Sequence, residues 1–341
     1  MKAVVYDAPL SYAITEIPTP EPGAGEVRIK VQQVGVCGTD LHIHAGDFMA
    51  EFPLIPGHEV VGVIDALGEG VVGLALGEQV AVNPNIYCGY CDYCLAGRLI
   101  LCPNLKGMGS NFPGFFAEYS VVPATLVFST EGLDPDVAVF AEPASCAMHG
   151  LESAQVRPGS SALVLGAGPT GLLLAQMLAS GGASSVTVAA PTQYKLDTAE
   201  KLGVDRTVLI DRDDAEGNID RLRAASPKGD GYDLVVEATG SAAVGAICVP
   251  LTRNGGTVLI YGVTHTTDTV AFHPFDVFRR EITIKGSFAE ITSVAAAISA
   301  LRAGRVRTDG IITHRFHIDD YAQALDAVAS NPDAHKVVLY T

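Results

Sequence analysis

Residues 162–172 read ALVLGAGPTGL, an apolar strand followed by the pattern G-x-G-x-x-G and the start of a helix. Gly166 permits a tight turn, Gly168 lets the backbone approach a pyrophosphate, and Gly171 lets the helix pack closely on the strand. The N–H groups that begin the helix are available to bind an anion. The stretch therefore predicts a dinucleotide site with these contacts: Gly166, Gly168, Pro169, Thr170 and Gly171.

The surroundings of this pattern decide its meaning, because a chain with 36 glycines can match it by chance. From about residue 145, apolar strands alternate with helical stretches, which is typical of a doubly wound parallel sheet in an α/β fold. We expect the strands at 162–165, 185–189, 207–210, 233–237, 257–261 and 282–284. Thr239 follows the fourth strand, and Gly262 and Val263 follow the fifth, so these residues are expected to flank the cofactor.

The end of the second strand bears on the choice of cofactor. Sites that prefer NAD usually carry Asp or Glu there, where the carboxylate binds the ribose hydroxyls. Here Ala190 occupies that position. Thr192 and Lys195 follow it, and Arg212 lies just past the third strand. The missing carboxylate and the two cations favour NADP. Alternatively, Ala190 does not discriminate, both cations are solvated, and NAD is the cofactor.

Composition limits the class of protein. The chain has 341 residues and a formal charge of −16. This length predicts two domains, since single cores rarely grow beyond about 300 residues. The negative charge argues against a nucleic-acid partner, which requires a basic surface. We find neither an export signal at the start nor an apolar run long enough for a membrane span, so a cytoplasmic protein without a membrane partner is expected.

Four of the seven cysteines form the run Cys88-x2-Cys91-x2-Cys94-x7-Cys102. Such closely spaced thiols in a chain without an export signal favour metal binding over disulfides. Because a closed set of four thiolates is a structural zinc site, we expect one Zn²⁺ here. A DNA-binding zinc finger is disfavoured, since the loop carries few cations and no recognition helix is evident.

Three further motifs lie in the first part of the chain, which is rich in Gly, Pro and short alternating strands. They are CGTDLH at 37–42, GHE at 57–59 and AEP at 141–143. With the four-Cys run and the glycine pattern, these motifs stand in an order and spacing that resembles the zinc-containing medium-chain dehydrogenase/reductase superfamily over essentially the whole chain. The Glu-Pro pair at 142–143 is similar to the polyol and threonine dehydrogenase branches.

The resemblance implies a division of the chain into three segments. Residues 1–144 would form a GroES-like, twisted β catalytic domain that carries both zinc sites. Residues 145–288 would form a Rossmann dinucleotide-binding domain. Residues 289–341 would return to the catalytic domain. The resemblance also implies a homo-oligomer, either a tetramer or a dimer.

The resemblance implies that Cys37, His58 and Glu142 are the ligands of a catalytic zinc. A thiolate, an imidazole and a carboxylate are suitable donors, and a catalytic zinc keeps a fourth position open. Taken singly, each residue also fits a structural role, as a small core thiol, a buried histidine or an anion at a helix entry. Their joint occurrence favours the metal site.

Four other residues receive roles from the same resemblance. Glu59 would lie beside the metal and enter its coordination transiently. Asp40 would accept the second N–H of the ligating histidine and thereby orient the ring. Thr39 would hydrogen-bond the substrate alcohol, and His42 would end a proton relay that runs through the nicotinamide ribose.

The expected activity is hydride transfer between NAD(P) and a secondary alcohol, such as a polyol, a diol or an amino alcohol. A threonine-type or simple secondary-alcohol dehydrogenase is the alternative, and Glu290 could favour a cationic substrate. A non-catalytic, crystallin-like dinucleotide-binding protein and a zinc-free quinone reductase are disfavoured, because both sets of zinc ligands are complete.

Overall fold

The computed structural model describes residues 1–341, and the chain folds as two compact units. Unit 1 comprises Met1–Ser145, Glu290–Arg302 and Ile312–Thr341, and unit 2 comprises Cys146–Ala289 and Ala303–Ile311. Each unit has its own sheet and its own buried apolar core. None of the helices combines the length and the apolarity needed to cross a bilayer.

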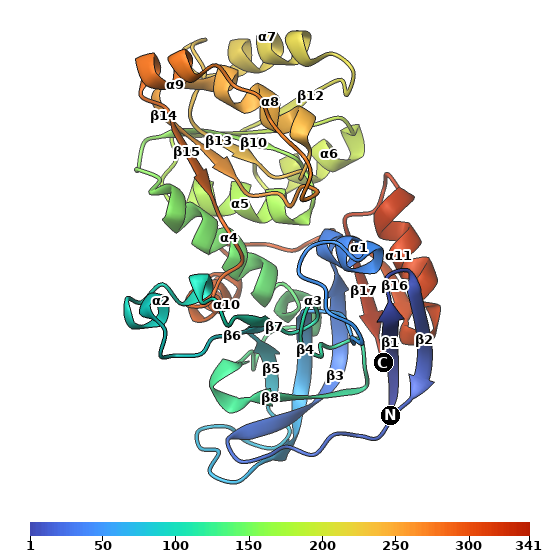
Figure 1. The fold of residues 1–341 in the computed structure, drawn as a ribbon. Coiled ribbons are helices and arrows are strands. Elements are labelled where there is room, and N and C mark those ends of the chain that lie inside the picture. The colour runs from blue at the N-terminus through green and yellow to red at the C-terminus, as the bar shows by residue number, and fades with distance from the viewer. The chain divides into compact units, whose positions relative to one another are not determined.

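Unit 2 is built around a parallel sheet with the strand order β12-β11-β10-β13-β14-β15. Its strands are β10 (Ser161–Leu165), β11 (Ser185–Ala190), β12 (Arg206–Leu209), β13 (Tyr232–Glu237), β14 (Thr252–Ile260) and β15 (Thr283–Gly286). Its helices are α5 (Pro169–Ser180), α6 (Gln193–Lys201), α7 (Ala215–Ala225), α8 (Ala242–Leu251) and α9 (Pro274–Arg280), and α4 (Ala141–Ala154) runs from unit 1 into unit 2. Figure 1 shows α5 and α8 on opposite faces of the sheet. This is the Rossmann arrangement that the sequence predicted.

All six strands predicted for this part of the chain are present, and each predicted range overlaps an observed strand. Strands buried on both faces produce continuous apolar runs, which are easy to recognise in a sequence. The main difference is that β14 begins at Thr252 rather than at 257. Its first part, the polar stretch Arg-Asn-Gly-Gly at 253–256, does not resemble a buried strand.

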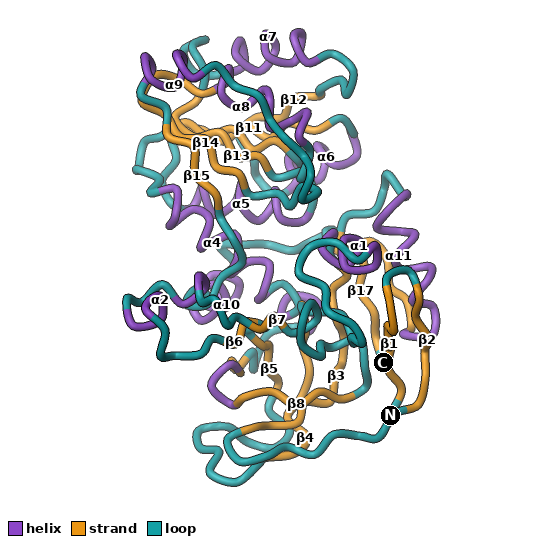
Figure 2. The backbone as a smooth tube through the Cα atoms, viewed as in Figure 1, coloured by secondary structure: helices purple, strands orange, loops and turns teal.

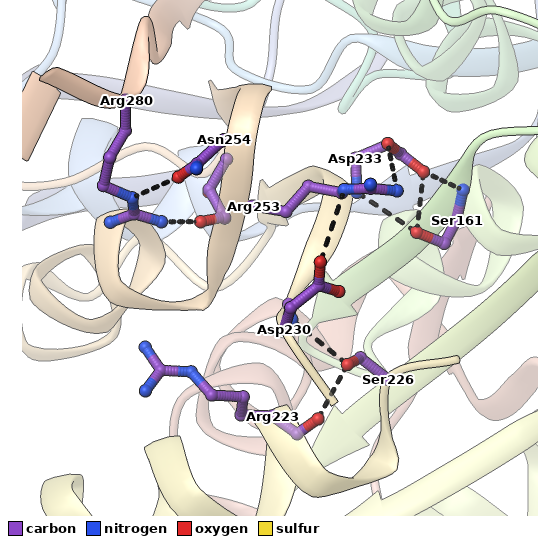
Figure 3. A network of polar contacts seen from close by, with 10 residues as sticks. Ser161, Arg223, Ser226, Asp230, Asp233, Arg253, Asn254 and Arg280 are labelled. Carbon is purple, nitrogen blue, oxygen red and sulfur yellow. Dashed lines mark hydrogen bonds and ion pairs between the residues drawn. The ribbon is translucent and has the colours of Figure 1, made fainter. Parts of the chain in front are cut away.

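Polar side chains tie together the amino ends of the strands in unit 2 (Figure 3). Asp233 in β13 accepts hydrogen bonds from the backbone N–H and the hydroxyl of Ser161, the first residue of β10, both at 2.8 Å. Arg253 in β14 donates to the same carboxylate at 3.2 Å. Ligands of such sheets bind at the opposite, carboxyl ends of the strands, so this network stabilises the fold and is not a candidate site.

Unit 1 contains a seven-stranded sheet in which β16-β17-β3-β4-β5-β9 are adjacent in that order and β8 also pairs with β3. These strands are β3 (Glu26–Val36), β4 (Glu59–Leu67), β5 (Gln79–Val82), β8 (Tyr119–Pro123), β9 (Val127–Ser129), β16 (Ile312–His317) and β17 (Lys336–Tyr340). Two small sheets are formed by β1 (Lys2–Ala8) with β2 (Ser11–Glu16) and by β6 (Asn85–Ile86) with β7 (Lys106–Gly107). Figure 2 shows long strands joined by extended loops, in agreement with the predicted twisted β domain.

Short helices lie in the connections between the strands of unit 1. They are α1 (Gly38–Ala45), α2 (Asp92–Leu95), α3 (Pro135–Ala138), α10 (Val294–Arg302) and α11 (Tyr321–Ser330), with 3₁₀ turns η1 (Leu99–Leu101), η2 (Ala124–Leu126) and η3 (Ile318–Asp320). The largest fully buried side chains of this unit include Tyr6, Phe115, Phe116 and Tyr321. Tyr321 begins α11, so this helix is packed against the core that the N-terminal strands also form.

The C-terminal part of the chain contributes to both units. The sequence analysis assigned all of residues 289–341 to a segment that returns to the first domain, but residues 303–311 belong to unit 2. Gln176 in α5 holds them there, because its amide donates to the backbone carbonyl of Arg307 at 3.0 Å and accepts the Arg307 N–H at 2.8 Å. A buried glutamine of α5 therefore helps to attach this segment to unit 2.

Candidate functional site

The first part of the site is the junction between β3 and α1. Cys37 leaves the strand in extended backbone and caps α1, and its backbone N–H donates to Oδ2 of Asp40 at 2.8 Å. This capping interaction fixes the first turn of the helix. Thr39 lies in the same turn, with its Oγ1 3.7 Å from the Cys37 Sγ. A thiol and a hydroxyl are thus presented side by side.

The second part is the start of β4. Gly57 has a φ of +89°, and a Cβ there would lie 2.6 Å from the ring of Phe116, so only glycine fits before His58. The following pair, His58 and Glu59, meets Cys37, and the three ligand atoms lie within 4.8 Å of one another. Sulfur, imidazole nitrogen and carboxylate oxygen are together a donor set suited to Zn²⁺.

Asp40 is completely buried beside His58, with its Oδ1 3.7 Å from the His58 Nδ1. Burial alone would lower the pKa of His58, but the charge of Asp40, followed by Cys37 and Glu142, raises it well above its ordinary value. Burial also raises the pKa of Asp40 itself. Oδ1 makes no hydrogen bond to another group, so it remains available to the imidazole.

Glu142 lies in the first turn of α4 and is buried. Its charge contributes to the raised pKa values of both His58 and Lys336. The sequence analysis named Glu142 as the third ligand and Glu59 as a transient one. In the structure, Glu59 is the carboxylate whose oxygen lies within 4.8 Å of the other two donors.

Lys336, the first residue of β17, was not identified from the sequence. Its Nζ donates to both carboxylate oxygens of Glu59, at 2.7 and 2.6 Å. The partners are 277 residues apart in the chain, and the lysine stands at the start of an apolar strand. No local pattern could have revealed the pairing.

The four clustered cysteines surround a single point. The Sγ atoms of Cys88 and Cys94 are 4.0 Å apart, and those of Cys91 and Cys102 are 3.9 Å apart. Four sulfurs arranged tetrahedrally at about 2.3 Å from Zn²⁺ would be separated by about 3.8 Å. The spacing therefore fits one zinc ion without rearrangement of the loop.

The pKa values of the clustered cysteines also favour a bound zinc ion. Burial raises the pKa of Cys88, but the N–H groups of Tyr90 and Cys91 outweigh it and lower the pKa to about 6. Burial and the neighbouring thiols raise the pKa of Cys94 to about 12. Four adjacent thiols cannot all ionise unless a cation offsets their charge, which a divalent metal would do.

The glycine pattern in unit 2 has the geometry that was expected. Gly166 has a φ of +118°, and a Cβ there would lie 2.9 Å from the Thr239 side chain. A Cβ at Gly171 would lie 2.0 Å from the carbonyl oxygen of Gly166. Gly168 caps α5, with Pro169 as the first helical residue, and a Cβ at Gly168 would meet no protein atom within 4 Å. The N-terminus of α5 is therefore open to a ligand.

The loops after the fourth and fifth strands meet beside this turn. Glu237 ends β13, and its carboxylate accepts the backbone N–H of Thr239 at 2.8 Å. A Cβ at Gly262 would lie 2.1 Å from the N atom of Gly240, and one at Gly240 would lie 2.2 Å from the carbonyl oxygen of Val263. The structure thus brings together the two loops that the sequence analysis expected to flank the cofactor.

The region beyond β11 contains the residues expected near the adenosine. Ala190 is the last residue of β11 and is buried, and Thr192 precedes α6. Lys195 is half-buried in the first turn of α6, and Arg212 is exposed just after β12. No carboxylate ends β11, as predicted.

Two other sequence expectations involve residues in unit 1. The Nδ1 of His42 lies 3.5 Å from Oδ2 of Asp47, so this half-buried imidazole is close to a carboxylate. Glu290, which could have favoured a cationic substrate, is fully buried, and its Oε2 accepts the backbone N–H of Ser293 at 2.9 Å just before α10. One of its two carboxylate oxygens thus binds the backbone at the start of α10.

Comparisons with known proteins agree with these features. The family model "Alcohol dehydrogenase GroES-like domain" matches residues 23–132, and "Zinc-binding dehydrogenase" matches residues 169–302. D-arabinitol dehydrogenase 1 of Uromyces fabae is 41% identical over 97% of this chain and 94% of that protein. L-threonine 3-dehydrogenase of Aeromonas hydrophila is 33% identical over 96% of this chain and 95% of that protein.

Solved structures share the whole fold. A zinc-binding dehydrogenase from Sinorhizobium meliloti with NADP bound has a TM-score of 0.91 and 33% identity, covering 100% of this chain and 99% of that one. An Escherichia coli alcohol dehydrogenase with NADH bound has a TM-score of 0.91 and 30% identity, with the same coverage. The chain therefore belongs to the zinc-binding alcohol dehydrogenase family of NAD(P)-linked oxidoreductases.

Proposed function

We propose that this dehydrogenase holds one catalytic and one structural zinc ion and transfers hydride between a secondary alcohol and NAD(P). The observation that carries the proposal is the meeting of Cys37, His58 and the Glu59 carboxylate beside the Thr39 hydroxyl, while Glu142 remains the third ligand predicted from the sequence. Cys37, His58 and Glu142 would hold the catalytic ion, and Cys88, Cys91, Cys94 and Cys102 the structural one. Bound zinc would act as a Lewis acid that lowers the pKa of an alcohol.

The protein's own groups would then orient the alcohol and move its proton. Thr39 stands in the first turn of α1 beside the candidate ligand Cys37, where its hydroxyl can accept a hydrogen bond from the substrate hydroxyl and donate its own proton to the next group of a relay. His42 lies one turn further along α1 and would pass the proton to solvent. Asp40 would keep the imidazole of His58 in its ligating orientation.

We assign the two parts of the reaction to the predicted domains. Residues 1–144 would form the catalytic domain with both zinc sites, and residues 145–288 the dinucleotide-binding domain. The open N-terminus of α5 would receive the pyrophosphate. The loops at Thr239 and at Gly262 and Val263 would contact the nicotinamide half of the cofactor.

A polyol or related diol is the favoured substrate class. The arabinitol dehydrogenase relative is 41% identical, against 33% for the threonine dehydrogenase relative. The burial of Glu290 and its bond to the Ser293 N–H weigh against its contact with a cationic substrate. A threonine-type or simple secondary-alcohol dehydrogenase is the second candidate, supported by the threonine dehydrogenase relative.

NADP is the favoured cofactor, on the residues that follow β11. With Ala190 at the end of this strand, a 2′-phosphate would meet no carboxylate there. Lys195 in the first turn of α6 and the exposed Arg212 are the candidate phosphate partners. NAD is the alternative, since a related structure carries NADH.

A homo-oligomer, either a tetramer or a dimer, would assemble through unit 2. β15 is an edge strand, and an exposed sheet edge offers unpaired backbone groups to a second copy. Next to it, α9 exposes Phe275 at 68% and Phe278 at 78% of their surfaces. Large exposed aromatics beside a free edge are typical of an interface.

A cytoplasmic location is also proposed. All seven cysteines are outside disulfides, which fits the reducing cytoplasm.

Two measurements test the proposed function. Metal analysis after dialysis should give two zinc ions per chain, and a value near zero would remove the proposed chemistry. Oxidation of a panel of polyols, diols, amino alcohols and threonine, each with NAD and with NADP, should show turnover mainly with the polyols. Activity confined to threonine would replace the favoured substrate class with the second candidate.

A further inference from the structure

We propose that the buried carboxylate of Glu237 is a fixed anion of the dinucleotide site, which strengthens the binding of oxidised, cationic nicotinamide relative to the reduced, neutral form. Glu237 ends β13 and is 1% exposed. The inference rests on the proposed function, since it presumes that the cofactor binds at the N-terminus of α5 and at the loops after β13 and β14. It assigns to this site a residue that distinguishes the two redox states of the cofactor.

The first observation is that Glu237 joins the two loops that flank the proposed site. Its Oε1 accepts the Thr239 N–H at 2.8 Å and also the Thr239 hydroxyl, and its Oε2 accepts the Gly240 N–H at 3.2 Å. Its backbone carbonyl accepts the N–H groups of Tyr261 and Gly262, at 3.0 and 2.9 Å. One residue therefore holds the loop after β13 beside the loop after β14.

The second observation is the close packing around the carboxylate. A Cβ at Gly262 would lie 2.6 Å from Oε2 of Glu237. Thr239, which Oε1 binds, lies against the dinucleotide pattern, since a Cβ at Gly166 would lie 2.9 Å from the Thr239 Cγ2. The carboxylate is thus packed against one loop of the proposed site, and its partner Thr239 is packed against the glycine turn.

The third observation is that the hydrogen-bond partners of the carboxylate are uncharged. They are two backbone N–H groups and one hydroxyl. Burial, followed by the charge of Glu237, raises the pKa of the Cys248 thiol in α8, so this charge acts on other groups of unit 2. Solvent screens the field of a buried charge less than that of an exposed one.

The two redox states of the cofactor differ in the charge of the ring. Oxidised nicotinamide carries one positive charge, and the hydride that it accepts from an alcohol makes it neutral. A fixed anion beside the site attracts the cationic ring and has no such effect on the neutral one. Glu237 would therefore favour the cofactor state that is ready to oxidise an alcohol.

The test measures the dissociation constants of NAD⁺, of NADH, and of a neutral analogue of NAD⁺ in which carbon-linked benzamide replaces nicotinamide. Calorimetric titration of the wild-type protein should show that NAD⁺ binds about 3- to 10-fold more tightly than the neutral analogue. Glu237→Gln removes the charge but keeps the size of the side chain, so this preference should disappear. The ratio of the Kd for NAD⁺ to the Kd for NADH should rise by about the same 3- to 10-fold.

Thr239→Val is the matched control, because it removes the hydroxyl donor and keeps the charge of the carboxylate. It should weaken the binding of NAD⁺ and NADH by the same factor, so the ratio of their Kd values should not change. An unchanged ratio in Glu237→Gln, or an equal change of the ratio in Thr239→Val, would overturn the proposal.

If Glu237→Gln does not fold, the wild-type protein alone decides, since equal affinities for NAD⁺ and the neutral analogue would overturn the proposal. Wild-type protein that binds no dinucleotide would instead overturn the proposed function, so the two failures are distinguishable.

Discussion

Gly35 and Glu59 face each other across the β3–β4 pair so closely that a Cβ on the glycine would lie 1.9 Å from the glutamate Oε2. Gly35→Ala should therefore displace a carboxylate that is buried and bonded to Lys336. Because breaking a buried ion pair leaves two charges uncompensated, we expect a loss of about 3 kcal/mol in the free energy of unfolding. Urea denaturation measures this loss.

Gly38→Ala is the matched control for that measurement. Gly38 is the first residue of α1, which follows β3, and a Cβ there would meet no atom within 4 Å. This substitution should change the free energy of unfolding by less than about 1 kcal/mol. Equal effects at the two glycines would show that the approach to Glu59 is not the constraint.

The two metal sites should respond differently to the loss of one ligand. Cys88→Ser should lower the thermal midpoint by roughly 5–10 °C, because a structural zinc contributes folding free energy. His58→Ala should reduce turnover by about 10³-fold, while the protein stays folded and still binds dinucleotide. Calorimetry, steady-state kinetics and dinucleotide fluorescence titration provide the measurements. Loss of activity in Cys88→Ser without any loss of stability would contradict this division.

The stability of unit 2 should depend on pH through the ionisation of Asp233. Burial alone would raise the pKa of this carboxyl, but the N–H and hydroxyl of Ser161, followed by Arg253, outweigh it and lower the pKa below its ordinary value. The stabilisation is therefore fully present above the unfolded pKa and is lost as the pH falls through the folded pKa. We expect Asp233→Asn to cost about 1 kcal/mol at pH 7, a value that allows for partial solvent screening, and less at lower pH.

Urea denaturation of wild type and Asp233→Asn at pH 7 and near pH 3 tests this prediction. The difference between the two proteins is the quantity of interest, since other acidic groups and the metal ligands also titrate in that range. A difference that stays constant with pH would mean that the charge of Asp233 is not what stabilises the sheet.

The sequence predicted those parts of the site that depend on short spacings. The four cysteines span 15 positions of one loop, and the glycine pattern is confined to a single turn, so their local order determines their geometry. The parallel strands were recognisable because they are apolar throughout. In these cases the residues that form the feature are neighbours in the chain, so the sequence alone was sufficient to predict it.

Lys336 was missed because its partner lies in a distant part of the chain. Lys336 begins a strand whose other residues are apolar, and in the sequence such a lysine resembles an exposed strand end. Only the pairing of β17 with β3 brings it to Glu59, 277 residues away. For Glu290 the charge suggested a substrate contact, whereas in the structure the residue is buried and its Oε2 accepts the Ser293 N–H before α10.

The surface around α9 makes a prediction about assembly. Replacing both Phe275 and Phe278 by Ser should produce a smaller species, because the proposed interface would lose its two most exposed aromatic side chains. Leu76→Ser is the control, since Leu76 is an equally prominent exposed side chain of unit 1. Light scattering coupled to gel filtration compares the masses. An unchanged mass in the double variant would exclude this face as the interface.

Cofactor choice is tested first at the end of β11. Replacing Ala190 by Asp puts a carboxylate where the structure has a buried methyl group. This anion would repel a 2′-phosphate and offer the ribose hydroxyls of NAD two acceptors, so the ratio of kcat/KM for NADP to that for NAD should fall. Wild-type kinetics with a large preference for NAD would refute the NADP assignment and leave the dehydrogenase function intact.

Lys195 provides the complementary test, because it would donate to the same 2′-phosphate that the new carboxylate repels in the Ala190→Asp variant. Lys195→Ala should raise the KM for NADP more than the KM for NAD, by an amount corresponding to about 1–3 kcal/mol for a direct, partly desolvated contact. Lys201→Ala is the matched control, since Lys201 lies in the last turn of the same helix, α6. Equal changes for both cofactors in Lys195→Ala would mean that the lysine acts on the helix and not on the 2′-phosphate. A change for NADP alone, absent in Lys201→Ala, would locate the recognition of the phosphate at the first turn of α6.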